Sequence, residues 1–318
     1  MRPGDGVIRE KVKINGQNSF GKGKGYMFKY NYFRAASLED VCTALEEHAG
    51  KARIIAGGTD IMVQIREKDK RWKDLECLID ISFLERELRY IREEKEEIHI
   101  GALATHTDLE QSELIRKWIP FLGEAAATVG SPQIRNRGTI GGSICNASPA
   151  ADPLTPLIAA DARVVVFGRN GERTESLKDF YVSQGKVNLK PDEFVKEFVV
   201  KKLDPDAVTA FVKLGRRKSL AISRLNVSAI LKFAEDGRIA YARISPGCIF
   251  STPDRVQAAE ELLIGQKASQ ELWQKAGKAV SEEMIRRTGV RWSTEYKQPA
   301  VEALVERALQ EAAEKAVQ

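Results

Sequence analysis

Short apolar runs, separated by charged or glycine-containing stretches, predict a mixture of strands and helices over residues 27–203. Runs bounded by glycine or charged residues favour strands, because a buried strand needs only a few consecutive apolar side chains. The expected strands lie at residues 53–56, 77–81, 97–102, 162–167 and 193–203. Asn170-Gly171, after the fourth of these, is typical of a hairpin turn.

Capping signals predict the helices between these strands. Ser37, which has an acidic residue three positions later, marks the start of a helix that ends at Gly50. Thr107 is expected to cap a helix over residues 107–115. A further helix is expected over residues 120–130, because proline is tolerated in a first helical turn and a glycine stands at the end.

From residue 204 the pattern changes to longer strands followed by long helices. Strands are expected at 209–214, 226–233 and 238–245, and helices at 254–263, 269–287 and from residue 299 onward. A meander of strands covered by helices on one face makes an α+β unit.

These patterns divide the chain into three parts. Residues 1–26 are polar, basic and rich in glycine, so we expect a flexible arm there. Residues 27–203 are expected to form one domain of two lobes, at about 27–82 and 83–203, and residues 204–318 a second domain. The predicted fold class is α+β.

Two glycine pairs beside hydroxyl side chains are the main candidate for chemistry. Glycines 57–58 precede Thr59, and glycines 141–142 follow Thr139. Glycine permits turns in which successive backbone N–H groups form a nest for an anion, so two such turns would hold one diphosphate. Either pair alone is more typical of an ordinary turn.

The residues around the glycine pairs narrow the kind of ligand. Asp152 would be repelled by phosphates, so we expect it near a sugar hydroxyl or a ring N–H. The sequence contains no Gly-x-x-x-x-Gly-Lys-Ser/Thr, and neither pair extends to Gly-x-Gly-x-x-Gly. A nucleotide site of another kind is therefore indicated.

Three motifs in order carry a family resemblance. They are IAGGTDI at residues 55–61, IGALAT at 100–105 and GSPQIRNRGTIGG at 130–142. They resemble the FAD-binding, or medium, subunit of molybdenum hydroxylases, in the branch of xanthine dehydrogenase and nicotinate dehydrogenase. The resemblance runs from Met27 almost to the C-terminus. It implies a two-lobed FAD-binding domain of the vanillyl-alcohol-oxidase (PCMH) type, followed by the α+β C-terminal domain of such subunits.

The resemblance also assigns positions to FAD between the two lobes. These are Arg53, Ile54, Ile55, Ala56, Gly57, Gly58, Thr59, Asp60, Ile61, Val129, Gly130, Thr139, Ile140, Gly141, Gly142, Asn146, Ser148, Asp152, Leu189 and Arg224.

Three of these assignments carry further expectations. Arg224 falls where relatives place a cation that would stabilise reduced flavin, although a surface arginine explains it equally well. Ser143 replaces an asparagine that is common in relatives, which puts a direct flavin contact at that position in doubt. No histidine lies beside Gly57, so the FAD is expected to be bound non-covalently.

Composition excludes several other classes of protein. With 318 residues, 43% hydrophobic and 30% charged, the chain is long enough for two domains. Its net charge of +5 comes from mixed-sign runs, unlike the basic stripe of a nucleic-acid-binding protein. No apolar run could span a membrane and no secretory signal is present, so we expect a cytoplasmic protein. The histidines and cysteines are too scattered for a metal site.

The function implied by the resemblance is electron transfer. FAD would take electrons from [2Fe-2S] clusters on a small partner subunit, fed by a large molybdenum-binding subunit, and pass them to NAD+ or another acceptor. Xanthine is the expected substrate of the assembly, and nicotinate, another heterocycle or carbon monoxide are alternatives. The protein itself supplies no catalytic acid, base or nucleophile, because the chemistry belongs to the flavin.

Two readings from other classes remain open. A self-contained flavin oxidoreductase of the same fold would need a proton donor near the flavin, and the C-terminal domain offers no evident candidate. A scaffold that has lost its flavin would not need both glycine pairs and Asp152.

Overall fold

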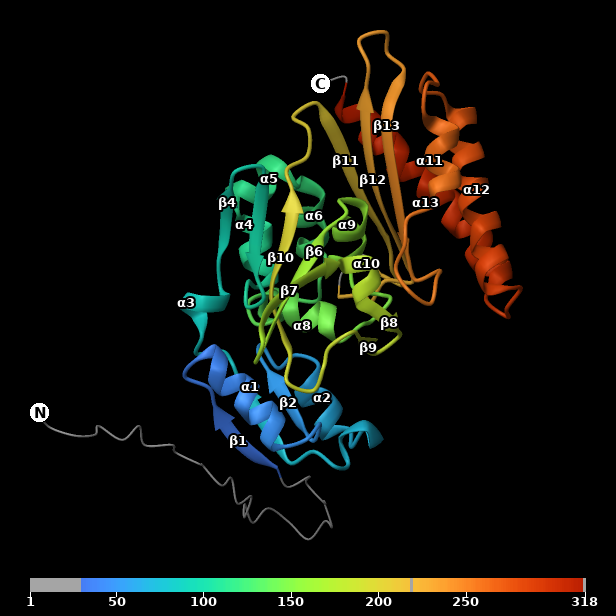
Figure 1. Ribbon diagram of the computed structural model, residues 1–318. Helices are drawn as coiled ribbons and strands as arrows, with labels where there is room; N and C mark the ends of the chain where they lie inside the picture. Colours follow the sequence, from blue (N-terminus) through green and yellow to red (C-terminus); the bar gives the residue numbers. More distant parts are fainter. Residues whose placement is uncertain (1–29, 218–219, 317–318) are drawn as a thin grey trace, which may run out of the picture.

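The computed structural model describes residues 30–217 and 220–316 (Figure 1). The arm expected over residues 1–26 lies outside this range. The fold is α+β, as predicted, and contains a small lobe, a larger lobe and a C-terminal layer of strands and helices.

The small lobe is built on a three-stranded parallel sheet. Its strands β1 (Asn31–Arg34), β2 (Ala52–Ile55) and β3 (Cys77–Asp80) are arranged in the order β1-β3-β2. Helix α1 (Leu38–Glu47) begins as predicted at Ser37, whose side chain accepts a hydrogen bond from the Asp40 backbone. It packs its apolar side on β2 and β3.

Two further elements complete the small lobe. Helix α2 (Ile61–Arg66) follows the first glycine pair, and the one-turn helix η1 (Lys70–Trp72) leads into β3. Both contribute to a separate apolar cluster beneath the sheet.

A five-stranded antiparallel sheet organises the larger lobe. Its order is β4-β5-β10-β6-β7, with β4 (Ile91–Glu94), β5 (Glu97–Gly101), β6 (Arg163–Gly168), β7 (Gly171–Ser176) and β10 (Phe194–Lys201). The hairpin between β6 and β7 turns at the predicted Asn170-Gly171 position. Phe198 in the central strand lies opposite both Ile100 and Val164, so the core runs across the sheet.

Short helices and a hairpin complete the larger lobe. They are α3 (Glu85–Leu88), α4 (His106–Gln111), α5 (Glu113–Trp118), α6 (Pro120–Ala127), α7 (Pro132–Arg135), α8 (Ile140–Cys145), α9 (Leu154–Ala159), α10 (Leu177–Phe180), β8 (Tyr181–Ser183) and β9 (Lys186–Val187).

The helix predicted over residues 107–115 is wrong in two respects. The cap is Thr105, whose hydroxyl accepts from the Asp108 backbone while the Asp108 carboxylate accepts from the Thr105 backbone. The chain then breaks at Ser112, which caps a second helix. The sequence pattern missed this break because Leu109 of the first helix and Ile115 of the second are both apolar and pack into the same core.

The C-terminal part is an antiparallel meander of long strands covered by helices. Strands β11 (Ala207–Leu214), β12 (Leu225–Phe233) and β13 (Ile239–Gly247) are followed by α11 (Gln257–Leu263), α12 (Gln270–Thr288) and α13 (Thr294–Lys315). Helix α13 crosses β11 and β12, and α12 packs on α13 (Figure 1). The other side of the meander meets α6 and α9 of the larger lobe, so the sheet is covered on both faces.

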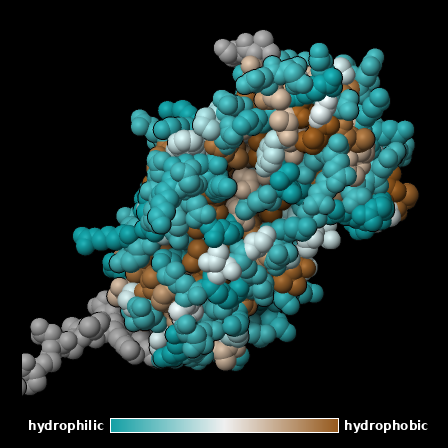
Figure 2. Space-filling model, turned by 45° about the horizontal axis from the view of Figure 1, so that its top comes forward, coloured by the Kyte–Doolittle hydropathy of each residue, from teal (hydrophilic) through white to brown (hydrophobic). Residues whose placement is uncertain are grey.

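The face drawn in Figure 2 is largely hydrophilic, with hydrophobic residues in separate patches. Among residues 30–217 and 220–316, no helix is both long and apolar enough to cross a membrane.

Candidate functional site

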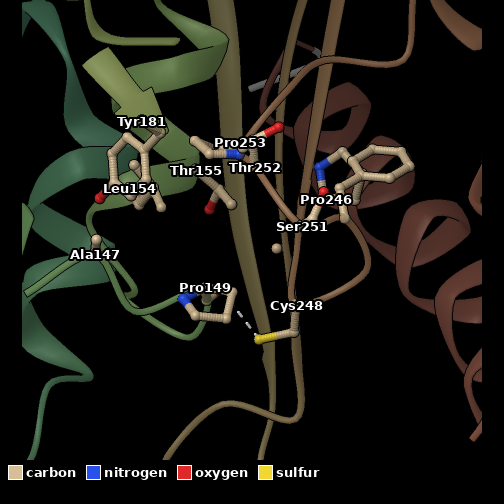
Figure 3. A pocket seen from close by; sticks show the side chains of 12 residues that line it. Ala147, Pro149, Leu154, Thr155, Tyr181, Pro246, Cys248, Ser251, Thr252 and Pro253 are labelled. Carbon is tan, nitrogen blue, oxygen red and sulfur yellow. Dashed lines mark hydrogen bonds between the residues drawn. The ribbon is translucent and has the colours of Figure 1, made fainter. Parts of the chain in front are cut away.

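A cavity of about 950 Å³ is lined by residues of both lobes. This volume lies within the range of about 300–1,000 Å³ that is typical of small-molecule and cofactor sites. On the small lobe its lining follows β2 and the turn into α2, and on the larger lobe it follows α8 and the segment from β9 to β10. A second recess, whose lining includes Tyr181, Pro246 and Cys248, holds only about 20 Å³, which is room for a water molecule (Figure 3).

Most of the positions predicted to touch FAD line the large cavity. They are Arg53, Ile54, Ala56, Gly57, Gly58, Thr59, Asp60, Ile61, Val129, Thr139, Gly141, Gly142, Asn146 and Leu189. The other predicted positions are outside its lining, and these are Ile55, Gly130, Ile140, Ser148, Asp152 and Arg224.

The first glycine pair forms a turn at the rim of this cavity. Gly58 has a φ of +74°, a conformation that side chains with a Cβ rarely adopt. A Cβ on Gly57 would lie 1.8 Å from the carbonyl oxygen of Arg137. The two lobes are therefore in contact here through backbone atoms, with no room for a side chain.

The backbone N–H groups of residues 57–60 carry the binding chemistry of this turn. Within the described part of the chain they donate no hydrogen bond to the protein. Amides of half-buried residues such as 57–59 are almost always paired, so a run of free donors at a cavity rim is suited to an anion such as a diphosphate. The nest predicted for the first glycine pair is therefore available.

The nest predicted for the second glycine pair is wrong. Residues 141–142 lie in the first turn of α8, where Thr139 is the cap and its hydroxyl accepts from the Gly142 backbone. The amides of Ile140 and Gly141 donate to Ala104 and Ala102, and the Ser143 amide donates to Thr139. Gly141 is glycine because a Cβ would lie 2.7 Å from the Ala102 oxygen.

Comparison with known proteins identifies the family to which this architecture belongs. A family model described as the FAD binding domain in molybdopterin dehydrogenase matches residues 27–200, and one described as the CO dehydrogenase flavoprotein C-terminal domain matches residues 210–312. The chain belongs to the FAD-binding subunits of the molybdenum hydroxylases.

Relatives of this FAD-binding subunit span nearly its whole length. The nicotinate dehydrogenase FAD-subunit of Eubacterium barkeri is 35% identical over 282 residues, which cover 87% of this chain and 94% of that protein. The xanthine dehydrogenase FAD-binding subunit of Escherichia coli O157:H7 is 29% identical over 289 residues, covering 90% and 97%. These relatives are dehydrogenase subunits, so the predicted oxidoreductase class is confirmed.

A solved relative confirms the predicted fold. A chain in the structure of carbon monoxide dehydrogenase from Hydrogenophaga pseudoflava superposes with a TM-score of 0.82 at 29% identity, covering 90% of this chain and 98% of that one. The family cofactor is FAD, as predicted. Among the described residues, no group of three or more His, Cys, Asp or Glu side chains could hold a metal ion.

Cationic side chains of the FAD-binding subunit favour a phosphate-containing ligand in the cavity. Arg53, Arg71, Lys186 and Lys190 all line it. Arg53 donates only to backbone carbonyls in the described structure, and desolvation lowers its pKa. A bound diphosphate would supply the counter-charge that Arg53 lacks.

His106 is a site residue that sequence reasoning missed. It lines the cavity, is only 3% exposed, and its Nδ1 has no hydrogen-bond partner. Burial first, and the nearby Arg135 second, lower its pKa from 6.5 to about 4, so it is neutral at physiological pH. The sequence did not indicate a place for His106 in the cavity, because a lone histidine that follows a strand is usually a structural residue.

Asp152 does not face the cavity. One carboxylate oxygen accepts from Ser223 and from Asn226 at 3.1 Å, and the other accepts from Lys213 and from Thr128 at 3.1 Å. Its expected contact with a sugar or a ring is replaced in this structure by four donors from the protein.

Arg224, predicted to place a cation near the flavin, does not line the cavity either. Arg224 is exposed, and its guanidinium lies 5.3 Å from the centre of the Tyr296 ring. The half-buried Lys213, paired with Asp152, is a cation of this region that sequence analysis could have found only as a lysine within the apolar strand predicted at 209–214.

Proposed function

We propose that this chain carries FAD non-covalently in the cavity between its two lobes and transfers electrons within a molybdenum hydroxylase. The observation that carries the proposal is the run of free amides at residues 57–60, at the rim of a cavity of about 950 Å³ whose lining includes four cations. These donors suit a diphosphate, and membership of the family indicates that the diphosphate is that of FAD.

The residues that line the cavity would hold the cofactor in distinct ways. Amides 57–60 and Arg53 would bind the diphosphate, while the Thr59 and Thr139 hydroxyls and Asn146 remain close enough to the ligand space to bind polar oxygens. FAD, once bound, supplies the electron-transfer chemistry.

The assembly is proposed from the relatives. A large molybdenum-binding subunit and a small [2Fe-2S] subunit would pass electrons to this chain, and NAD+ or another acceptor would take them. We further propose the domain division 27–203 and 204–318, and a cytoplasmic location.

The substrate of the assembly would be chosen on another polypeptide. The nicotinate relative is 35% identical and the xanthine relative 29%, so nicotinate is the first substrate to assay and xanthine the second. This order reverses the expectation drawn from the sequence motifs.

The test of the proposal is FAD binding by the purified chain. A two-band flavin absorption spectrum should survive gel filtration, and acid precipitation should release all of the flavin into the supernatant. Gly57→Ala should lower the affinity for FAD by at least about tenfold, because its Cβ would collide with the Arg137 carbonyl and displace the turn that carries the free amides.

Gly123→Ala is the matched control for this variant. Gly123 lies in α6, and the nearest atom to its added Cβ would be 3.4 Å away, so FAD binding should not change. A folded wild-type chain that binds no FAD would remove the proposal, and flavin that stays in the acid precipitate would contradict its non-covalent form.

A further inference from the structure

We propose that Trp72 is the stacking wall for the adenine base of the bound dinucleotide, and that it determines how tightly this half of the cofactor is held. This inference rests on the proposed function, since it concerns the same cavity. It adds Trp72, which lies outside the glycine motifs, to the binding site and assigns the part of the cavity beside it to the adenine half of FAD.

The indole of Trp72 is held in a defined orientation at the cavity lining. Its Nε1 donates to the Gln64 side chain at 3.0 Å, and the Gln64 amide donates across to Asn146 at 3.4 Å. Trp72 and Gln64 belong to the small lobe, whereas Asn146 ends α8 of the larger lobe. The ring is therefore positioned before any ligand arrives, by a relay that joins the two lobes.

Two guanidinium groups lie against the same ring. Arg53 is 5.2 Å and Arg71 is 5.6 Å from the ring of Trp72, and Arg71 is itself fixed by Asp69. Aromatic and guanidinium planes are the surfaces on which proteins stack nucleic-acid bases. Together these three side chains form an aromatic and cationic wall at the cavity lining.

The position of this wall relative to the phosphate site selects the adenine half. Arg53 lacks an acidic partner in the described structure, lies over the Trp72 ring, and lines the same cavity as the free amides of residues 57–60. In FAD a ribose ring separates adenine from the diphosphate, whereas the longer ribityl chain separates the flavin from it. A ring that touches Arg53 is therefore within closer reach of adenine.

The remaining surroundings agree with this assignment. Gly57 meets the segment before α8 through Arg137, and His106 packs on Gly138 there. Trp72 is joined through Gln64 to Asn146, at the opposite end of α8. The helix has six residues, which is a length of about 9 Å, so the wall and the turn at Gly57 are separate parts of one elongated site.

The experiment compares two halves of the cofactor on the apoprotein. ADP, FMN and FAD are titrated calorimetrically into the wild type, Trp72→Leu and Trp72→Phe. In Trp72→Leu the affinity for ADP and for FAD should fall about tenfold, as expected when one stacking contact is lost, and that for FMN should stay within twofold. Trp72→Phe keeps an aromatic face and should recover most of the ADP affinity.

A second readout does not depend on affinity. ADP absorbs no light in the region of tryptophan emission, so a change in emission on ADP binding reports contact. The wild type should show this change, and Trp72→Phe should not. Trp292→Leu is the matched control, because Trp292 is 97% exposed and is absent from the cavity lining.

The outcomes separate this inference from the proposed function. Weaker FMN binding with unchanged ADP binding in Trp72→Leu would overturn it, as would ADP affinity that is unchanged in both variants, while FAD binding by the wild type would stand. If Trp72→Leu does not fold, the emission change and Trp72→Phe still decide. A wild type that binds none of the three ligands would remove both proposals.

Discussion

Single residues at the site show how strongly the environment determines a chemical role. His106 resembles many histidines that follow a strand, yet in the fold it is 3% exposed, lies against Gly138 and lines the cavity. Its pKa of about 4 follows mainly from lost solvation. Above about pH 4 the imidazole of His106 is therefore neutral and adds no charge to the cavity.

The lowered pKa of His106 predicts a pH dependence of stability. Between its unfolded pKa of about 6.5 and its folded pKa of about 4, the unfolded chain binds a proton that the folded chain does not. The free energy of unfolding should therefore fall as the pH decreases through this window, by up to ~1.4 kcal/mol per pH unit from this group.

Urea unfolding of His106→Phe at several pH values checks this prediction. Between pH 6.5 and pH 5, above the range where most carboxylates titrate, the variant should lose less stability than the wild type. Equal slopes for His106→Phe and the wild type would show that His106 is protonated in the fold.

At the scale of elements, helix α4 depends on its capping residue. The capping box joins Thr105 and Asp108, and an isolated bridge joins Thr105 to Thr139, the cap of α8. The start of α4 is thus fixed to the start of the helix that lines the cavity. Sequence analysis placed the cap at Thr107, since both threonines precede the same apolar positions.

Replacing the two threonines separately distinguishes these assignments. Thr105→Ala should lower the free energy of unfolding by about 1 kcal/mol, because the amide of Asp108 loses its acceptor. Thr105→Ser should restore most of this loss. Thr107→Ala should change stability by no more than about 0.5 kcal/mol, although it loses a surface contact with Asn136. A larger cost at Thr107 would contradict the observed cap.

At the scale of the whole molecule, a buried polar network joins the larger lobe to the C-terminal meander. Asp152 follows α8, whereas Lys213, Ser223 and Asn226 belong to β11, β12 and the connection between them. Strands β11 and β12 lie between α6 and α9 on one side and α13 on the other (Figure 1). The network therefore fixes the meander against the cofactor lobe.

A double-mutant cycle on Asp152 and Lys213 measures this connection. Asp152→Ala should cost about 3 kcal/mol, because it leaves the half-buried ammonium group of Lys213 without a counter-charge, with only the Thr128 carbonyl as acceptor. Lys213→Met should cost less, since three donors remain on Asp152. The double variant should cost less than the sum, with a coupling of at least about 1 kcal/mol in urea unfolding.

The surface pair Lys232–Asp204 is the control for that cycle. Both of its side chains are partly exposed, so its coupling should stay below about 1 kcal/mol. If the Asp152–Lys213 pair shows no more coupling than this surface pair, the network does not join the two parts energetically.

The sequence by itself determined the fold class, the family and the first glycine turn. The pattern of apolar positions predicts which segments become strands. A glycine such as Gly57 indicates a position where the backbone cannot accept a side chain, and this can be predicted from the local sequence alone. Motifs in order along the chain then indicated FAD, and most of the predicted positions line one cavity.

Only the tertiary structure decided which of these groups are free to bind. The amides of residues 140–143 are taken by the protein, whereas those of 57–60 are not. Asp152 is enclosed by donors from strands that lie some sixty to seventy positions later in the chain, and Trp72 meets Arg53 only after folding. Whether a donor or a charge remains available depends on contacts between distant segments, which residue type and spacing do not record.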